Sequence, residues 1–170
     1  YGSSQMLFTF RNAGPLASSI TQIYFEKGSR TPLKHLNSIT YLMGQLAFSQ
    51  ATGNLGRPPG AQNINWGNKG TEFRADAGSP VPKNGIGPGE SLGLVFSLST
   101  GFTFNNVISD LDTSAWRICF HAQSFSGEGN DSDTFVLGDP IQTVPDTTST
   151  LAALSCSLLL LLGARRKLAC

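Results

Sequence analysis

Hydrophobic and polar side chains alternate along several short stretches of the chain, with the period of two that is typical of β-strands. The pattern is clearest in residues 91–98 and 115–122, and each stretch predicts a strand with one buried face. The hydrophobic face of the second stretch consists of Trp116, Ile118, Phe120 and Ala122, and its opposite face of Arg117, Cys119 and His121. Further strands are predicted at residues 5–11, 19–25, 71–77 and 132–137.

Two segments are less clearly patterned. In residues 32–51 the spacing of Leu36, Ile39, Leu42 and Leu46 is compatible with a helix, but we favour short strands at residues 39–42 and 46–49 around Gly44. Residues 104–112 predict a loop or a single helical turn.

Glycine and proline separate these elements. Residues 52–70 contain five glycines and a Pro-Pro pair, which predicts a long surface loop, and residues 78–89 are again rich in turn formers. Several short strands joined by such turns indicate an all-β domain over residues 1–138. We expect an antiparallel β-sandwich of jelly-roll type.

The C-terminal region has a different composition. A linker over residues 139–146 leads to residues 147–164, eighteen residues without a charge, and a basic tip follows at residues 165–170. A helix of that length spans about 27 Å, close to the ~30 Å of a bilayer core, so we predict a single transmembrane helix in preference to a buried core helix. Arg165, Arg166 and Lys167 place the tip in the cytoplasm and the β domain outside.

Charge and cysteine content narrow the function. The 170 residues carry 12 Lys+Arg and 11 Asp+Glu, a formal charge of +1, and without the basic tip nine cations face eleven anions. This balance argues against nucleic-acid binding. Of the three cysteines only Cys119 lies in the β domain, so neither a disulfide framework nor a structural zinc site is expected there, and Cys119 is interpreted as a small core residue.

The sequence Val144-Pro145-Asp146, followed by the leucine-rich stretch and the basic tip, resembles the C-terminal PEP-CTERM sorting signal in its VPD, or VPDSG-type, variant. Thr147 and Thr148 stand where that variant usually has Ser or Gly. The resemblance implies recognition by an exosortase, a membrane-bound processing enzyme, and removal of the tail near Pro145-Asp146. A short extended peptide at this place suits the groove of such an enzyme.

The β domain is itself similar to domains found ahead of such signals in exported bacterial proteins, through residues 8–12, 18–25, 84–92 and 116–121. This resemblance implies an exported protein of the cell envelope or an exopolysaccharide matrix, and it brings no catalytic residue. Two alternatives remain: a secreted carbohydrate-binding module, and a permanently membrane-anchored accessory protein.

The residues themselves do not predict an enzyme. His121 and Cys119 are two apart on one strand face, about 6–7 Å, which is too far for a direct hydrogen bond. Ser124 and Ser126 lie near His121, but no G-x-S-x-G turn is present. We therefore expect no catalytic residue and no cofactor.

Two loops carry candidate binding residues. Trp66 lies among asparagines, which suits a glycan contact, although the side chain could equally fold back under its own loop. Glu128, Asn130, Asp131 and Asp133 offer oxygen ligands for Ca²⁺, with a plain hairpin loop as the favoured alternative.

Overall fold

The computed structural model describes residues 4–14, 17–66, 70–125 and 131–137. The chain divides into two compact units, residues 1–140 and 141–170. All described residues belong to the first unit, which we call the β domain.

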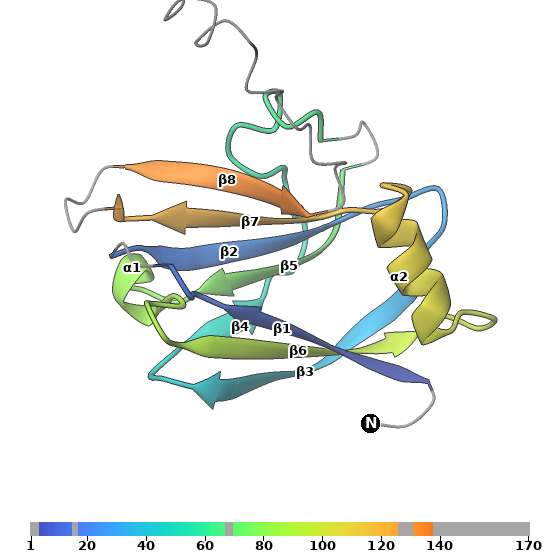
Figure 1. The fold of residues 1–170 in the computed structure, drawn as a ribbon, viewed down its shortest axis with the longest axis horizontal. Helices are drawn as coiled ribbons and strands as arrows, with labels where there is room; N and C mark the ends of the chain where they lie inside the picture. Colours follow the sequence, from blue (N-terminus) through green and yellow to red (C-terminus); the bar gives the residue numbers. More distant parts are fainter. Residues whose placement is uncertain (1–3, 15–16, 67–69, 126–130, 138–170) are drawn as a thin grey trace, which may run out of the picture. The chain divides into compact units, whose positions relative to one another are not determined.

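The described part of the β domain contains eight strands and two helices. The strands are β1 Gln5–Arg11, β2 Ser19–Glu26, β3 Leu33–Met43, β4 Phe48–Gln50, β5 Thr71–Ala77, β6 Ser91–Leu98, β7 Ile118–Gln123 and β8 Ser132–Leu137. They form a three-stranded sheet in the order β1-β6-β3 and a five-stranded sheet in the order β4-β5-β2-β7-β8 (Figure 1). All strand pairs are antiparallel, which confirms the prediction of an antiparallel β domain with two sheets.

One hydrophobic core joins the facing sides of the two sheets. Leu92, Leu94 and Phe96 of β6 are fully buried, as the period of two predicts. Phe25 of β2 packs against Phe96 across the interface, with ring centroids 4.8 Å apart. It also stacks on Trp116 at 5.7 Å, so aromatic side chains from both sheets meet at this point.

The segment with the ambiguous pattern is extended. It forms the eleven-residue β3 and the short β4, so the strand prediction is confirmed, but β3 is much longer than expected. Its pairing with β6 contains three register shifts. These irregularities interrupt the alternation of buried and exposed positions and explain the weak pattern in the sequence.

The two helices lie at opposite ends of the sheets (Figure 1). The short α1, Val81–Asn84, begins next to Pro80 in the segment predicted to be turns. The nine-residue α2, Phe104–Asp112, is a full helix, which corrects the prediction of a loop or single turn. A capping box stabilises its start, because Asn106 N donates to Thr103 Oγ1 at 3.4 Å and Thr103 N donates to Asn106 Oδ1 at 2.9 Å.

Candidate functional site

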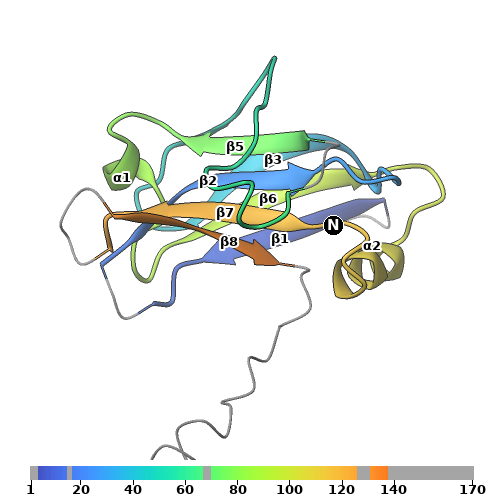
Figure 2. The same cartoon turned by 90° about the horizontal axis from the view of Figure 1, so that it is seen from above.

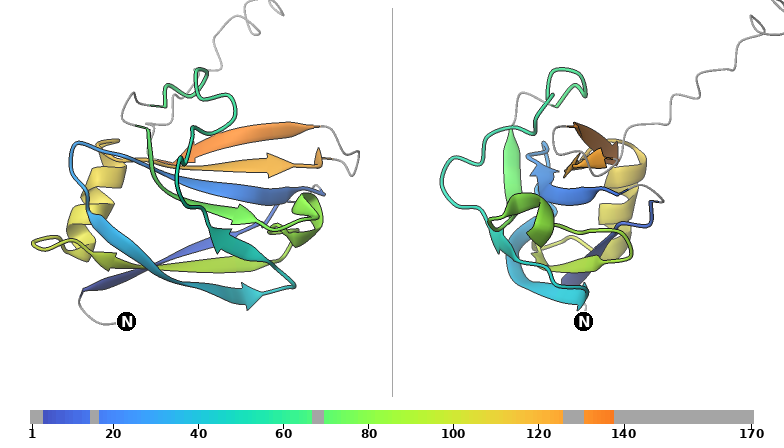
Figure 3. Two further views of the ribbon diagram at one scale, coloured as in Figure 1. Left: turned by 180° about the vertical axis from the view of Figure 1, so that it is seen from behind. Right: turned by 90° about the vertical axis from the view of Figure 1, so that its left-hand side faces the viewer.

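The outer face of the five-stranded sheet is covered by a loop. Residues 51–66, which we call the covering loop, leave β4 and cross over β5, β2 and β7 (Figures 2 and 3). Below it lies a second, small hydrophobic cluster of Tyr24, Ala61, Trp66 and Cys119. The outer face of β7, which points away from the main core, is therefore also buried.

A buried ion pair holds the end of the covering loop. Arg117, directly before β7, donates from Nε to Glu26 Oε2 at 2.9 Å and from Nη2 to Glu26 Oε1 at 2.8 Å. The same guanidinium donates to the backbone carbonyls of Ile64 at 3.1 Å and Asn65 at 2.6 Å, and it lies 5.6 Å from the ring centre of Trp66. Arg117 thus joins the sheet to the loop through charge-assisted hydrogen bonds.

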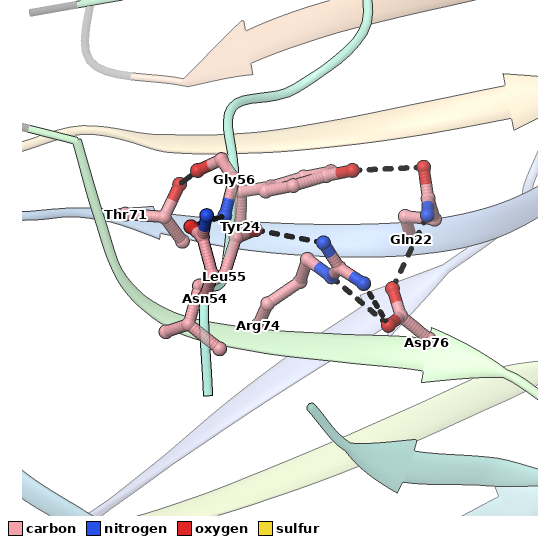
Figure 4. A network of polar contacts seen from close by, with 8 residues as sticks. All are labelled: Gln22, Tyr24, Asn54, Leu55, Gly56, Thr71, Arg74 and Asp76. Carbon is pink, nitrogen blue, oxygen red and sulfur yellow. Dashed lines mark hydrogen bonds and ion pairs between the residues drawn. The ribbon is translucent and has the colours of Figure 1, made fainter. Parts of the chain in front are cut away.

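A second polar network holds the beginning of the loop (Figure 4). Arg74 on β5 donates from Nε and Nη2 to Asp76 Oδ2, at 2.9 and 2.6 Å, and from Nη1 to the carbonyl of Leu55 at 2.7 Å. Tyr24 Oη donates to Gln22 Oε1 at 2.8 Å, and Gln22 Nε2 donates to Asp76 Oδ1 at 3.3 Å. Each carboxylate oxygen of Asp76 therefore accepts from a neighbouring side chain.

Burial changes the acidity of the groups under the loop. It raises the pKa of Tyr24 to about 12, with the nearby Arg74 acting in the opposite direction. It also raises the pKa of the Cys119 thiol to about 12. Both side chains are neutral near pH 7, and Cys119 is the small buried residue that the sequence predicts.

A small pocket lies between the covering loop and the β7–β8 hairpin. Its volume is about 190 Å³, and Pro59, Asn63 and Ile64 form its loop side. His121, Ser132, Asp133 and Thr134 form its hairpin side. His121 Nδ1 lies 3.0 Å from Thr134 Oγ1, and Thr134 Oγ1 donates to the carbonyl of Pro59 at 2.9 Å, so these hydrogen bonds connect strand, hairpin and loop.

His121 is only 4% exposed, although the alternation of the strand puts it on the predicted polar face. Burial lowers the pKa of its imidazole, partly offset by the backbone and charge of Asp133. The ring is therefore neutral near pH 7.

The C-terminal region identifies one function of the chain. Residues 143–168 match the family model of the VPDSG-CTERM motif. This segment is a PEP-CTERM-type sorting signal. No curated protein and no solved structure gives a significant match to the chain.

The sorting signal contains the residues from which the sequence predicts it. Val144, Pro145 and Asp146 lie at its start, and Arg165, Arg166 and Lys167 at its end, so the predicted resemblance is confirmed. These residues and the predicted transmembrane helix, 147–164, lie outside the described residues. Within the described ranges, no helix has the length and apolar content needed to cross a bilayer.

Trp66, the predicted glycan contact, does not form an exposed stacking surface in the structure. The side chain is 3% exposed and packs in the small cluster with Tyr24 and Cys119. Of the two orientations left open by the sequence, the structure has the one folded under the loop. A sugar could stack on this indole only after the covering loop moved away.

The calcium prediction is only partly covered by the structure. Glu128 and Asn130 lie outside the described residues, and Asp131 and Asp133 flank the start of β8. Asp133 Oδ1 accepts from Thr134 N at 2.7 Å. The described part of the chain holds no group of three or more His, Cys, Asp or Glu placed to bind a metal ion, and the calcium site stays a prediction.

Sequence reasoning missed the polar groups that hold the covering loop. Glu26 and Arg117 are 91 positions apart, and the carbonyls that Arg117 binds belong to a glycine-rich loop without a pattern of its own. The sequence signal for a buried loop was the presence of Trp66 and Ile64, two large apolar residues in a segment whose composition is otherwise typical of a solvent-exposed loop.

Proposed function

We propose that this protein is exported, that an exosortase-type membrane enzyme recognises its C-terminal sorting signal, and that the β domain ends as a non-catalytic component of the cell envelope or extracellular matrix. The VPDSG-CTERM match over residues 143–168 is the observation that carries this proposal. In this account the β domain is a sandwich of jelly-roll type.

The chemistry of the tail supports membrane insertion before processing. The uncharged residues 147–164 can span a bilayer core as one helix, and the cations at 165–167 favour the cytoplasmic side. Pro145 biases Val144 towards an extended backbone, the form that a protease groove can bind. The motif therefore lies just outside the membrane, next to the processing enzyme.

The described core residues all precede the proposed cleavage site in the sequence. The buried hydrophobic residues of the described part lie between Met6 and Ala122, and the last strand ends at Leu137. A cut near Pro145-Asp146 removes none of these residues. A processed β domain therefore keeps its whole main core.

The described side chains also support a non-catalytic role. The Cys119 thiol is buried and its pKa is raised to about 12, so it is a poor nucleophile. His121 Nδ1 lies 3.0 Å from the Thr134 hydroxyl, but this hydroxyl donates its proton to the Pro59 carbonyl, so the imidazole does not act as a base towards it.

The proposal is tested by changing the motif and following the fate of the tail in the native host. The double variant Pro145→Ala, Asp146→Asn changes two of the three motif residues, and Gln142→Ala is the matched control just outside the signal. We expect the double variant to accumulate uncut in the membrane fraction, while the control is released like the wild type.

Equal release of the two variants would overturn recognition through this motif. A wild-type chain that stays uncut in the membrane in the presence of the active enzyme would instead support the permanently anchored accessory protein. Binding of the released domain to glycans through Trp66 would support the carbohydrate-binding module.

A further inference from the structure

The pocket beside His121 has features of a ligand site that are independent of the sorting signal. It lies where the covering loop meets the β7–β8 hairpin, and its volume of about 190 Å³ has room for about six waters or one small ring. Its walls come from two segments about 60 residues apart in the sequence, and both are held by the hydrogen bonds described above.

Hydrogen-bond geometry determines which imidazole nitrogen carries the proton. The Thr134 hydroxyl has one proton, and it donates this proton to the carbonyl of Pro59. Thr134 Oγ1 must then accept from His121, so Nδ1 carries the hydrogen of the neutral ring. With the hydrogen on Nδ1, Nε2 is the ring nitrogen without a hydrogen, so it can act only as a hydrogen-bond acceptor.

The remaining polar groups of the pocket are neutral or acidic. Asn63 contributes an amide and Ser132 a hydroxyl, both on exposed positions at the rim, and Asp133 adds a carboxylate. None of the described lining residues is Lys or Arg, so these residues offer no cation to pair with a phosphate or carboxylate. The apolar walls of Pro59 and Ile64 suit the C–H face of a ring.

We infer that this pocket binds a neutral, hydroxyl-rich ring of the size of one sugar unit. Hydroxyl groups can donate to His121 Nε2 and can both donate to and accept from Asn63 and Ser132. This site differs from the glycan contact predicted at Trp66, because that indole is buried below the loop while the pocket opens beside it. The inference concerns the β domain alone and does not depend on processing of the tail.

The test follows the two histidines of the chain by NMR. The full chain, with ¹⁵N-labelled histidine, is held in phosphocholine micelles, which carry no sugar headgroups. Glucose, galactose, mannose and N-acetylglucosamine are the neutral probes, and glucosamine and glucuronate are the charged ones. His35, exposed on β3 of the other sheet, is the internal control.

We expect at least one neutral sugar to shift the His121 imidazole signals with saturation in the millimolar range, while His35 does not respond. Asn63→Ala should weaken this binding by about threefold or more, and Asn37→Ala, an exposed asparagine on β3, should leave it unchanged.

Three results would overturn the inference. The first is that no neutral sugar gives a saturable His121 shift up to about 100 mM, and the second is that only the charged sugars give one. The third is binding that Asn63→Ala leaves as strong as in the wild type, since the ligand would then lie elsewhere.

Discussion

Arg117 and Glu26 form a two-pronged ion pair on the outer face of the five-stranded sheet, with N···O distances of 2.8 and 2.9 Å and both side chains less than 10% exposed. The pair lies where β2 and β7 meet, because Glu26 N also donates to the Arg117 carbonyl at 3.0 Å. The guanidinium also donates hydrogen bonds to the end of the covering loop, so the ion pair links β2 and β7 to this loop.

Removal of one partner should therefore destabilise the domain strongly. Glu26→Gln removes the negative charge that Glu26 places beside the buried guanidinium, and breaking a buried pair in this way costs about 3–5 kcal/mol. Chemical unfolding followed by tryptophan fluorescence measures the change. Lys34→Gln, at an exposed position of β3, is the control and should alter the free energy of unfolding by less than about 0.5 kcal/mol. Equal stability of the two variants would show that the ion pair does not hold the loop.

The aromatic centre of the main core gives a second prediction. Phe25 is 1% exposed and contacts the rings of Phe8, Phe96 and Trp116. Phe25→Ala should lower the free energy of unfolding by about 3–5 kcal/mol through lost burial and the cavity left behind. Phe104→Ala, at a ring that is 57% exposed at the start of α2, should change it by less than about 0.5 kcal/mol. A cost at Phe104 as large as that at Phe25 would contradict the assigned core.

Protonation of His121 should make stability depend on pH. Its pKa in the folded protein is lowered by burial, so the unfolded chain binds the proton more readily. The stabilisation is then complete above the unfolded pKa of about 6.5 and declines as the pH falls below it. Melting temperatures between pH 8 and pH 5 should fall more steeply for the wild type than for His121→Asn. His35→Asn should follow the wild type, and a His121→Asn curve parallel to the wild type would refute the assignment.

The position of Trp66 can be checked by fluorescence quenching. The chain has two tryptophans, Trp66 and Trp116, which are 3% and 2% exposed. In the variant Trp116→Phe all indole emission comes from Trp66, and we expect acrylamide to quench it poorly in the folded protein. Strong quenching without unfolding would place Trp66 on the surface and restore the glycan contact expected from the sequence.

The buried thiol offers a further measurement. With Cys156→Ser and Cys170→Ser, Cys119 is the one cysteine left in the chain. Its zero exposure and a pKa of about 12 keep it protonated and inaccessible, so a disulfide reagent at pH 8 should label it only after unfolding. Rapid labelling of the folded protein would contradict this environment.

The strands were predictable from the sequence where burial follows a local pattern. Leu92, Leu94 and Phe96 recur with the period of two of a buried strand face, and this period predicts the strand although Val95 on the other face is buried as well. In β3 the register shifts break the alternation, so its length could not be predicted. The capping of α2 by Thr103 and Asn106 and the helical spacing of its apolar residues were both present in the sequence, so the full helix was predictable in this segment.

The pocket and the ion pairs could not be predicted, for a different reason. Arg117, Cys119 and His121 point away from the main core. They are buried because the covering loop, which lies about 55 residues earlier in the chain, packs over them. The residues of β7 themselves do not indicate that a loop covers this face. The sorting signal is the opposite case, because its motif, apolar stretch and cations follow one another along the chain and can be recognised without any fold.

The C-terminal mass of the protein purified from its native host shows whether the sorting signal is removed. We expect that, in cells with an active exosortase-type enzyme, the chain ends near Pro145-Asp146 and lacks residues 147–170. A released protein that still contains Arg165, Arg166 and Lys167 would contradict it.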